Sequence, residues 1–184
     1  MSMLKRNEVP VGETWNLNDL FSSEEAYLEA IEEVKQLVDI SAKQLPGTIT
    51  DAKGAIAAIE ATEKIQLKLV PIGTYASLSH SVDQTNTENQ MRSAQFGSLA
   101  ASIATKLSFV KSDLLALDEA ILKQAQQLNL SYENYINKLL VQKPHQLHPE
   151  AEKALAAFGA TFDAPYELYN TTKLVDMNFP DFEV

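Results

Sequence analysis

The sequence contains no cysteine among its 184 residues. Disulfide frameworks, thiolate zinc sites, iron–sulfur clusters and cysteine nucleophiles are therefore excluded from these residues. Glycine and proline are scarce, with 6 and 7 residues, which excludes collagen-like and low-complexity chains. At this length we expect one domain, because a chain of this size can bury a full core without cross-links.

Basic residues are also in short supply, with 15 against 25 acidic residues and a formal net charge of −10. This balance argues against binding to nucleic acid or to an anionic membrane surface, since both need positive charge. No apolar stretch follows Lys5 and Arg6, so no signal peptide is expected. The most apolar stretch, 96–117, is interrupted by Lys106, Lys111 and Asp113 and is not a membrane span. We expect a soluble, cytoplasmic protein.

Convincing period-two alternation is missing from most of the chain, whereas apolar residues recur at helical spacing almost throughout. The fold class is therefore predicted to be all-α, an elongated bundle of about six to eight helices. One long central helix over about 87–117 is predicted because apolar residues there step by three or four, at Phe96, Leu99, Ile103, Leu107, Val110, Leu114 and Leu117.

Helix boundaries are predicted from capping residues and from proline. Ser22 or Ser23 begins a helix that Pro46-Gly47 ends, and Thr50-Asp51 begins a second helix. Pro71 and Gly73 predict a kink in that second helix rather than a break. Further helices are expected after Asp118, after Ser131, from Glu150 to Phe158, and after the sequence Asp163-Ala164-Pro165.

The two ends of the chain are expected to differ from the bundle. Residues 1–22 are predicted to form an extended arm with an apolar anchor at Trp15, Leu17 and Phe21. The tail, 175–184, alternates apolar and polar residues from Asn178 onward, as a lone strand would. We expect a single helical domain over 1–184, with arm and anchor at 1–22, bundle at 23–174 and tail at 175–184.

Motifs that would carry catalysis are absent. The sequence has no His-Glu-x-x-His for zinc, no Glu-x-x-His for a di-iron bundle, and no glycine-rich phosphate loop. No catalytic, cofactor-binding or metal-binding residue is therefore assigned from the residues themselves.

The weak candidates each have a structural interpretation. His145 and His148, with Glu150 and Glu152 nearby, suggest a metal site, but a helix cap with solvated neighbours explains them better. Glu60 and Glu63 are interpreted as a solvated helix face rather than an acid/base pair.

Two further groups of residues are interpreted structurally. Asp83 and Asn86 are assigned to caps and turns. Trp15, Tyr132 and Tyr135 are assigned to the core rather than to a ligand cleft.

Four motifs in order resemble one family. They are Arg6 with Trp15-Asn16-Leu17-x-x-Leu20-Phe21, then Tyr75 with Asp83 and Asn86, then Pro144-His145-Gln146-Leu147-x-x-Glu150-x-Glu152, and last Asp176-Met177-x-Phe179. This succession resembles the N-terminal helical region of oligoendopeptidase F, a member of the thimet-oligopeptidase-like zinc metallopeptidases. Tyr132 and Asp176 join Trp15, Leu17 and Phe21 as expected structural anchors.

The resemblance implies a role without catalysis for this segment. Family members are much longer, and their zinc site, built on His-Glu-x-x-His, lies in a C-terminal catalytic domain that would be a partner of this segment. The segment would form part of the wall of a channel that admits oligopeptides. Zinc is then expected in the parent enzyme, whereas this chain alone is predicted to bind none and to be inactive.

A second hypothesis stays open beside the first. The long amphipathic helix and the missing catalytic motifs also suit a self-contained helical protein–protein interaction module. That module should leave no apolar face uncovered, whereas a segment of a larger peptidase should expose one and so self-associate.

Overall fold

The computed structural model describes residues 8–145, 147, 151, 154, 155, 157–173 and 177, apart from the side chain of Val11. These residues are helical for most of their length and contain no strand, so the predicted all-α class is confirmed. The chain divides into two compact units, one over Trp15–His145 and one that combines residues 1–14 with 146–184.

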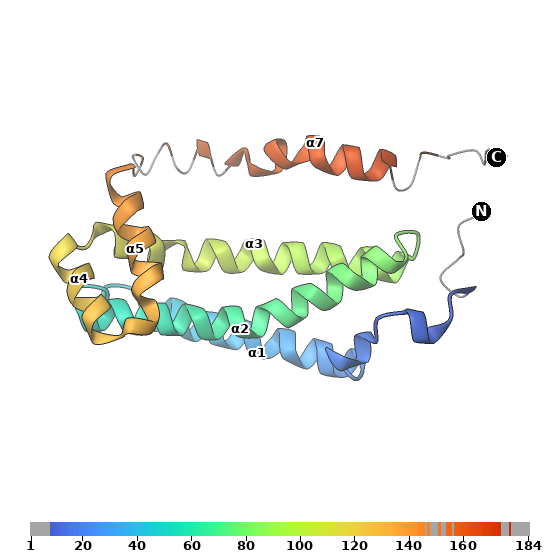
Figure 1. Ribbon diagram of the computed structural model, residues 1–184, viewed down its shortest axis with the longest axis horizontal. Coiled ribbons are helices and arrows are strands. Elements are labelled where there is room, and N and C mark those ends of the chain that lie inside the picture. The colour runs from blue at the N-terminus through green and yellow to red at the C-terminus, as the bar shows by residue number, and fades with distance from the viewer. Residues whose placement is uncertain are drawn as a thin grey trace. The chain divides into compact units, whose positions relative to one another are not determined.

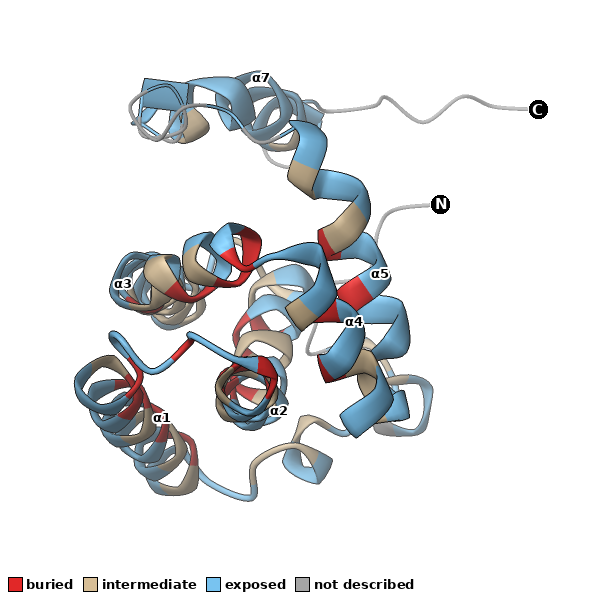
Figure 2. Cartoon of the chain, turned by 90° about the vertical axis from the view of Figure 1, so that its left-hand side faces the viewer, coloured by how far each residue is buried: buried red, intermediate tan, exposed pale blue. Residues whose placement is uncertain are grey.

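The unit over Trp15–His145 is a helical bundle. Its helices are α1 (Glu24–Gln44), α2 (Ala52–Val82), α3 (Thr87–Ala116), α4 (Glu119–Leu128) and α5 (Glu133–Gln142), with short 3-10 turns η3 (Leu17–Asp19), η4 (Leu130–Tyr132) and η5 (Lys143–His145). The three longest helices lie side by side, and α4 and α5 pack at one end of them (Figure 1). Buried residues gather where these helices face one another (Figure 2).

Capping residues set the start of each long helix. The Ser23 hydroxyl accepts a hydrogen bond from the Ala26 amide at 3.3 Å, and Asp51 accepts one from the Gly54 amide at 2.7 Å. Such side chains satisfy amides that have no partner within the helix. The predicted starts of the first two helices are therefore confirmed, with Ser23 as the first cap. Gly47, at φ +75, turns the chain between them.

Helix α2 contains Pro71 and does not break there. The proline removes one intrahelical hydrogen bond, to the Leu67 carbonyl, and its ring crowds that carbonyl. Figure 1 shows α2 changing direction along its length. The prediction of a kink rather than a break is confirmed, because the apolar residues on both sides of Pro71 remain packed against α1 and α3.

The predicted long helix is confirmed as α3. The Asn86 side chain accepts hydrogen bonds from the amides of Glu88 and Asn89 at 2.9 and 3.1 Å. The buried residues of α3 divide between two core clusters. Ile103 packs with Tyr27, Val34, Val38, Ile65, Leu69 and Ile72, whereas Val110 and Leu114 pack with residues of α2, α4 and α5 that include Ala55, Leu122 and Ile136.

Two predicted helix starts are wrong. Ser131 does not cap α5, because the Asn129 side chain accepts a hydrogen bond from the Ser131 amide at 3.1 Å and draws Ser131 into η4. In the second unit, Pro165 lies inside α7 (Gly159–Thr171) instead of at its start. Helical hydrogen bonding has begun earlier there, with Phe162 N–H donating to the Phe158 carbonyl at 3.0 Å.

The second unit also contains the 3-10 turn η2 (Val11–Glu13). Several predictions fall outside the described residues: the cap at His148-Pro149-Glu150, the anchor Asp176 and the strand from Asn178 onward.

Candidate functional site

No metal site is found in the described part of the chain. Nowhere in it do three or more His, Asp or Glu side chains gather as ligands would. His145 is exposed in η5, and its suggested partners His148, Glu150 and Glu152 lie outside the described residues. Two of the other acidic candidates, Glu63 and Asp83, make structural hydrogen bonds.

Glu63 is paired with an aromatic residue rather than with Glu60. The Tyr132 hydroxyl donates a hydrogen bond to the Glu63 carboxylate at 2.6 Å. This bond, together with desolvation, raises the pKa of Tyr132 to about 12. The contact joins α2 to η4 across 69 positions of sequence, so helical periodicity alone could not reveal it. Glu60 and Glu63 are therefore not assembled as an acid/base pair.

Asp83 and Asn86 shape the turn between α2 and α3. The Asp83 carboxylate accepts hydrogen bonds from the hydroxyl and the amide of Thr85, at 2.7 and 3.0 Å. These bonds lower the pKa of Asp83, the hydroxyl having the larger effect. With Asn86 as the α3 cap, the prediction that both residues serve caps and turns is confirmed.

The apolar anchor near the N-terminus is only partly buried. Trp15 is 81% exposed, so its assignment to the core is wrong. Leu17 and Phe21 are partly buried, and Phe21 packs against the core cluster that contains Tyr27 and Ile72. Tyr135 is likewise exposed, at 42%. Tyr132 packs against the core cluster that contains Leu114, Leu122 and Ile136.

Phe21 belongs to an aromatic cluster that sequence reasoning did not identify. Its ring meets Tyr27 and Tyr75 edge-on, with centroids 5.4 Å apart in each pair. The Arg92 guanidinium lies over both tyrosine rings, at 5.8 and 5.3 Å, and pairs with Glu24 at 2.8 Å. Burial raises the pKa of Tyr27, with Arg92 opposing the effect. The cluster joins α1, α2 and α3, and its charged groups are already paired.

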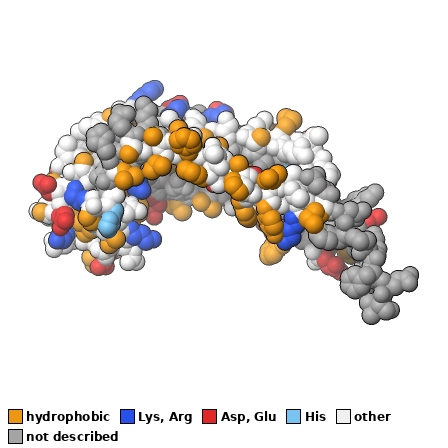
Figure 3. Space-filling model, turned by 90° about the horizontal axis from the view of Figure 1, so that it is seen from above, with side chains coloured by type: hydrophobic (Ala, Val, Ile, Leu, Met, Phe, Trp, Pro, Cys, Tyr) orange, Lys and Arg blue, Asp and Glu red, His pale blue; other side chains and the backbone are white. Residues whose placement is uncertain are grey.

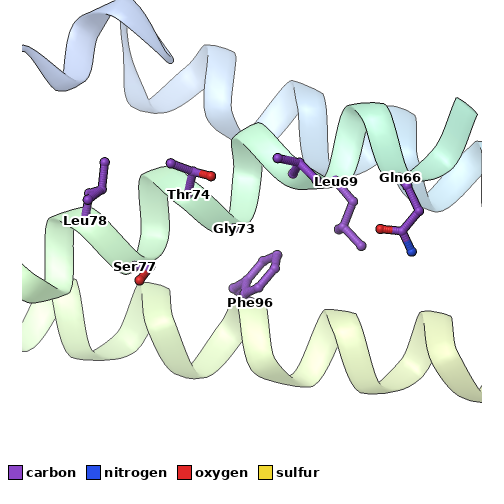
Figure 4. Close-up of a pocket in the computed structure, with 8 residues that line it drawn as sticks. Gln66, Leu69, Gly73, Thr74, Ser77, Leu78 and Phe96 are labelled. Carbon is purple, nitrogen blue, oxygen red and sulfur yellow. The ribbon is translucent and has the colours of Figure 1, made fainter. Parts of the chain in front are cut away.

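A recess between α2 and α3 has the chemistry of a binding surface. It measures about 450 Å³ and is lined by Gln66, Leu69, Val70, Gly73, Thr74, Ser77, Leu78 and Phe96. Figure 4 shows the Phe96 ring beneath Gly73, with side chains of α2 around it. A Cβ on Gly73 would overlap the Phe96 ring, so glycine is what allows this approach. The recess combines an apolar floor with amide and hydroxyl groups that can hydrogen-bond a ligand.

The candidate groups that the structure describes therefore contribute to packing and to a surface recess, and none of those described is assembled into a reaction centre. Among the described residues, no helix is both long and apolar enough to cross a membrane.

The comparisons with known proteins agree with one another. The sequence profile of the family described as Oligopeptidase F matches residues 113–179. Oligopeptidase PepF of Bacillus subtilis is 25% identical over 182 residues, 97% of this chain, and Group B oligopeptidase PepB of Streptococcus agalactiae is 28% identical over 171 residues, or 90%. The crystal structure of oligoendopeptidase-F from Enterococcus faecium matches 92% of the chain with a TM-score of 0.68 and 26% identity. The expected resemblance to the N-terminal region of oligoendopeptidase F is confirmed.

The match covers only a part of each oligoendopeptidase F relative. This chain spans 27% of PepF, 28% of PepB and 32% of the Enterococcus faecium chain. A putative peptidase from Chlamydophila abortus shares the fold alone, at 20% identity and a TM-score of 0.65, and 30% of it is covered.

Proposed function

We propose that this chain is the non-catalytic N-terminal segment of a zinc-dependent oligoendopeptidase that hydrolyses internal bonds of oligopeptides in the cytoplasm. One observation carries the proposal: more than nine-tenths of the chain aligns with PepF and with the oligoendopeptidase-F structure, and covers less than a third of either. The catalytic domain would be the remaining part of the same polypeptide, and residues 1–184 would form one domain of it.

Zinc does not fit the residues present here. The sequence lacks His-Glu-x-x-His, and no ligand group is found in the described part of the chain. In metallopeptidases zinc supplies an activated water for peptide hydrolysis. No step of that chemistry is assigned to a residue of this chain. Its proposed role is to form part of the wall of the channel that the substrate enters.

The recess between α2 and α3 is the candidate substrate-facing part of that wall. Its apolar floor around Phe96 suits side chains of an extended peptide, and Gln66, Thr74 and Ser77 offer groups for the peptide backbone. A wall of this kind selects by size, because a flexible peptide reaches the channel and a folded protein does not.

The first experiment is zinc analysis and a fluorogenic oligopeptide assay on the full-length product of the gene and on residues 1–184 alone. The proposal expects zinc and turnover in the full-length protein and neither in the 184-residue chain. Turnover by the 184-residue chain, or a full-length protein without zinc and turnover, would contradict it.

The recess is tested by thiol labelling, with alkylation followed on the proteolytic peptide that carries the new cysteine, since residues 1–184 contain no cysteine of their own. In the full-length protein, Ser77→Cys places a thiol in the recess, and Ser108→Cys places one on an exposed position of α3 outside it. An oligopeptide at saturation should slow alkylation at position 77 by about tenfold and leave position 108 unchanged. Equal alkylation rates at position 77 with and without peptide would show that the recess does not face the substrate.

The alternative, a helical protein–protein interaction module, should leave no apolar face uncovered. Described residues of the second unit expose large apolar side chains, which favours the peptidase segment over this module. The full-length assay separates the two functions, because an interaction module predicts no peptide hydrolysis.

A further inference from the structure

Helix α7 is rich in aromatic residues but has no buried side chain among its described residues. Phe158, which directly precedes the helix, and Phe162, Tyr166 and Tyr169 are between 54% and 67% exposed. Soluble proteins rarely leave four neighbouring aromatic side chains open to water, so this exposure needs an explanation. Figure 3 shows hydrophobic side chains gathered along this segment.

The four aromatic residues lie on one side of the helix. They follow at intervals of four, four and three positions, which keeps them within about 80° around an axis of 3.6 residues per turn. The Phe158 and Phe162 rings are already in contact, with centroids 6.2 Å apart. We call Phe158, Phe162, Tyr166 and Tyr169 the aromatic face.

The acidic residues of α7 lie away from the aromatic face. Asp163 and Glu167 are offset from its centre by about 100° or more at the same helical pitch. A helix with one aromatic side and one acidic side buries the first against a partner and keeps the second in water.

The size of the aromatic face helps to identify the partner. An aromatic side chain buries about 150–250 Å² when covered, so four of them at their present exposure offer roughly 400–600 Å². A stable complex of separate molecules needs about 800 Å² from each side. A partner on the same polypeptide needs less, because the covalent link has already removed the entropy of association.

The lengths of the relatives indicate what that partner is. PepF and the Enterococcus faecium oligoendopeptidase-F each contain more than twice as much further chain as they share with this one. We infer that the aromatic face of α7 docks this region onto the peptidase part of the same polypeptide. This inference rests on the proposed function and adds the surface through which the two parts meet.

The test is hydrogen–deuterium exchange of the α7 amides in the full-length protein and in the 184-residue chain. Docking protects helical amides by closing the local openings that permit exchange. We expect the amides of 162–171 to exchange at least tenfold more slowly in the full-length protein. Tyr166→Glu should restore fast exchange there, because a carboxylate cannot be buried without a partner.

The control variant is Leu67→Glu, which places the same charge on α2 at a side chain that is 70% exposed. It should leave exchange in α7 unchanged. In the 184-residue chain both variants should keep the helical circular dichroism, since neither side chain is buried there.

Peptidase activity of the same full-length sample keeps the two proposals apart. An active enzyme with α7 amides as fast as in the 184-residue chain would overturn the docking inference alone. Protected α7 amides in a protein without zinc or activity would support docking and contradict the proposed function. Protection of the α7 amides in the full-length protein that is lost on dilution would identify a second copy as the partner and overturn the inference.

Discussion

At the scale of single residues, three contacts between residues far apart in the sequence join one segment of the bundle to another. The Phe96 ring packs against the α2 backbone at Gly73, where there is no Cβ. The Tyr132 hydroxyl donates a hydrogen bond to the Glu63 carboxylate, and the Arg92 guanidinium donates one to the Glu24 carboxylate. Each contact joins different segments, and the two hydrogen bonds span 69 and 68 positions. Substitutions at these positions should therefore affect the packing of one segment on another rather than the local helix.

Gly73→Ala is predicted to destabilise the protein although alanine is the better helix former. The new methyl group would overlap the Phe96 ring, and overpacking of this kind costs about 1–3 kcal/mol. Gly97→Ala is the matched control, because nothing lies within 4 Å of the added Cβ and alanine should stabilise α3 by about 0.5–1 kcal/mol. Urea unfolding of both variants measures the difference. A stabilised Gly73→Ala protein would show that Phe96 does not occupy this position.

The Tyr132–Glu63 hydrogen bond predicts a pH dependence at the alkaline end. Because the folded-state pKa of Tyr132 is raised to about 12, the bond stabilises the fold fully below the unfolded value near 10. That stabilisation is lost as the pH rises from about 10 through about 12, since the unfolded state gives up its proton first.

Ultraviolet titration of the tyrosines provides the measurement. Tyr132→Phe should remove the component with a midpoint near 12, and Glu63→Gln should move that midpoint down toward 10. A titration curve that Tyr132→Phe leaves unchanged above pH 11 would contradict the hydrogen bond.

At the scale of helices, capping side chains mark the starts of the three longest helices. Asp51 and Asn86 cap α2 and α3 from adjacent positions, and these starts could be predicted because the signal is local. The end of α3 is different. The Lys143 ammonium, from η5, donates hydrogen bonds to the Leu115 and Leu117 carbonyls at 2.6 and 2.8 Å. A contact that spans 26 to 28 positions is not visible in a local pattern.

Lys143→Met is predicted to lower the free energy of unfolding by about 1–3 kcal/mol, because two carbonyls at the end of α3 lose a charged donor. Methionine keeps the length and apolar stem of lysine. Lys138→Met, at an exposed position of α5, should change stability by less than about 0.5 kcal/mol. Thermal or urea unfolding measures the difference in stability. Equal midpoints for the two variants would rule out a stabilising role for the Lys143 hydrogen bonds to the end of α3.

The wrong predictions at this scale have a common cause. Ser131 and Pro165 each carry a local signal for a helix start, but α5 and α7 begin at Glu133 and Gly159, where no side chain caps the helix. Asn129 captures the Ser131 amide, and α7 starts before Pro165. Trp15 is assigned to the core because aromatic residues at helical spacing are usually buried, but it lies before η3 and its side chain stays exposed. Helix existence could thus be predicted, and helix starts that no side-chain cap marks could not.

At the scale of the whole molecule, the sequence predicts the all-α class and the family resemblance, and the structure adds surfaces. The recess depends on Gly73 and Phe96, which packing brings together from two helices, whereas the aromatic face of α7 follows helical spacing and is recognised by its exposure. Neither carries a motif, so neither could be found by searching for spacings of catalytic residues. Both give this region a binding role in the larger peptidase that we propose.

One measurement tests that account most directly. The full-length protein is given one cleavable sequence in two forms, as a free oligopeptide and within a surface loop of a folded protein, and kcat/KM is measured with and without a zinc chelator. The account predicts chelator-sensitive cleavage of the free peptide that is at least a hundredfold faster than cleavage of the loop. Equal rates for the two forms would contradict the channel wall, and the absence of chelator-sensitive cleavage would contradict the peptidase itself.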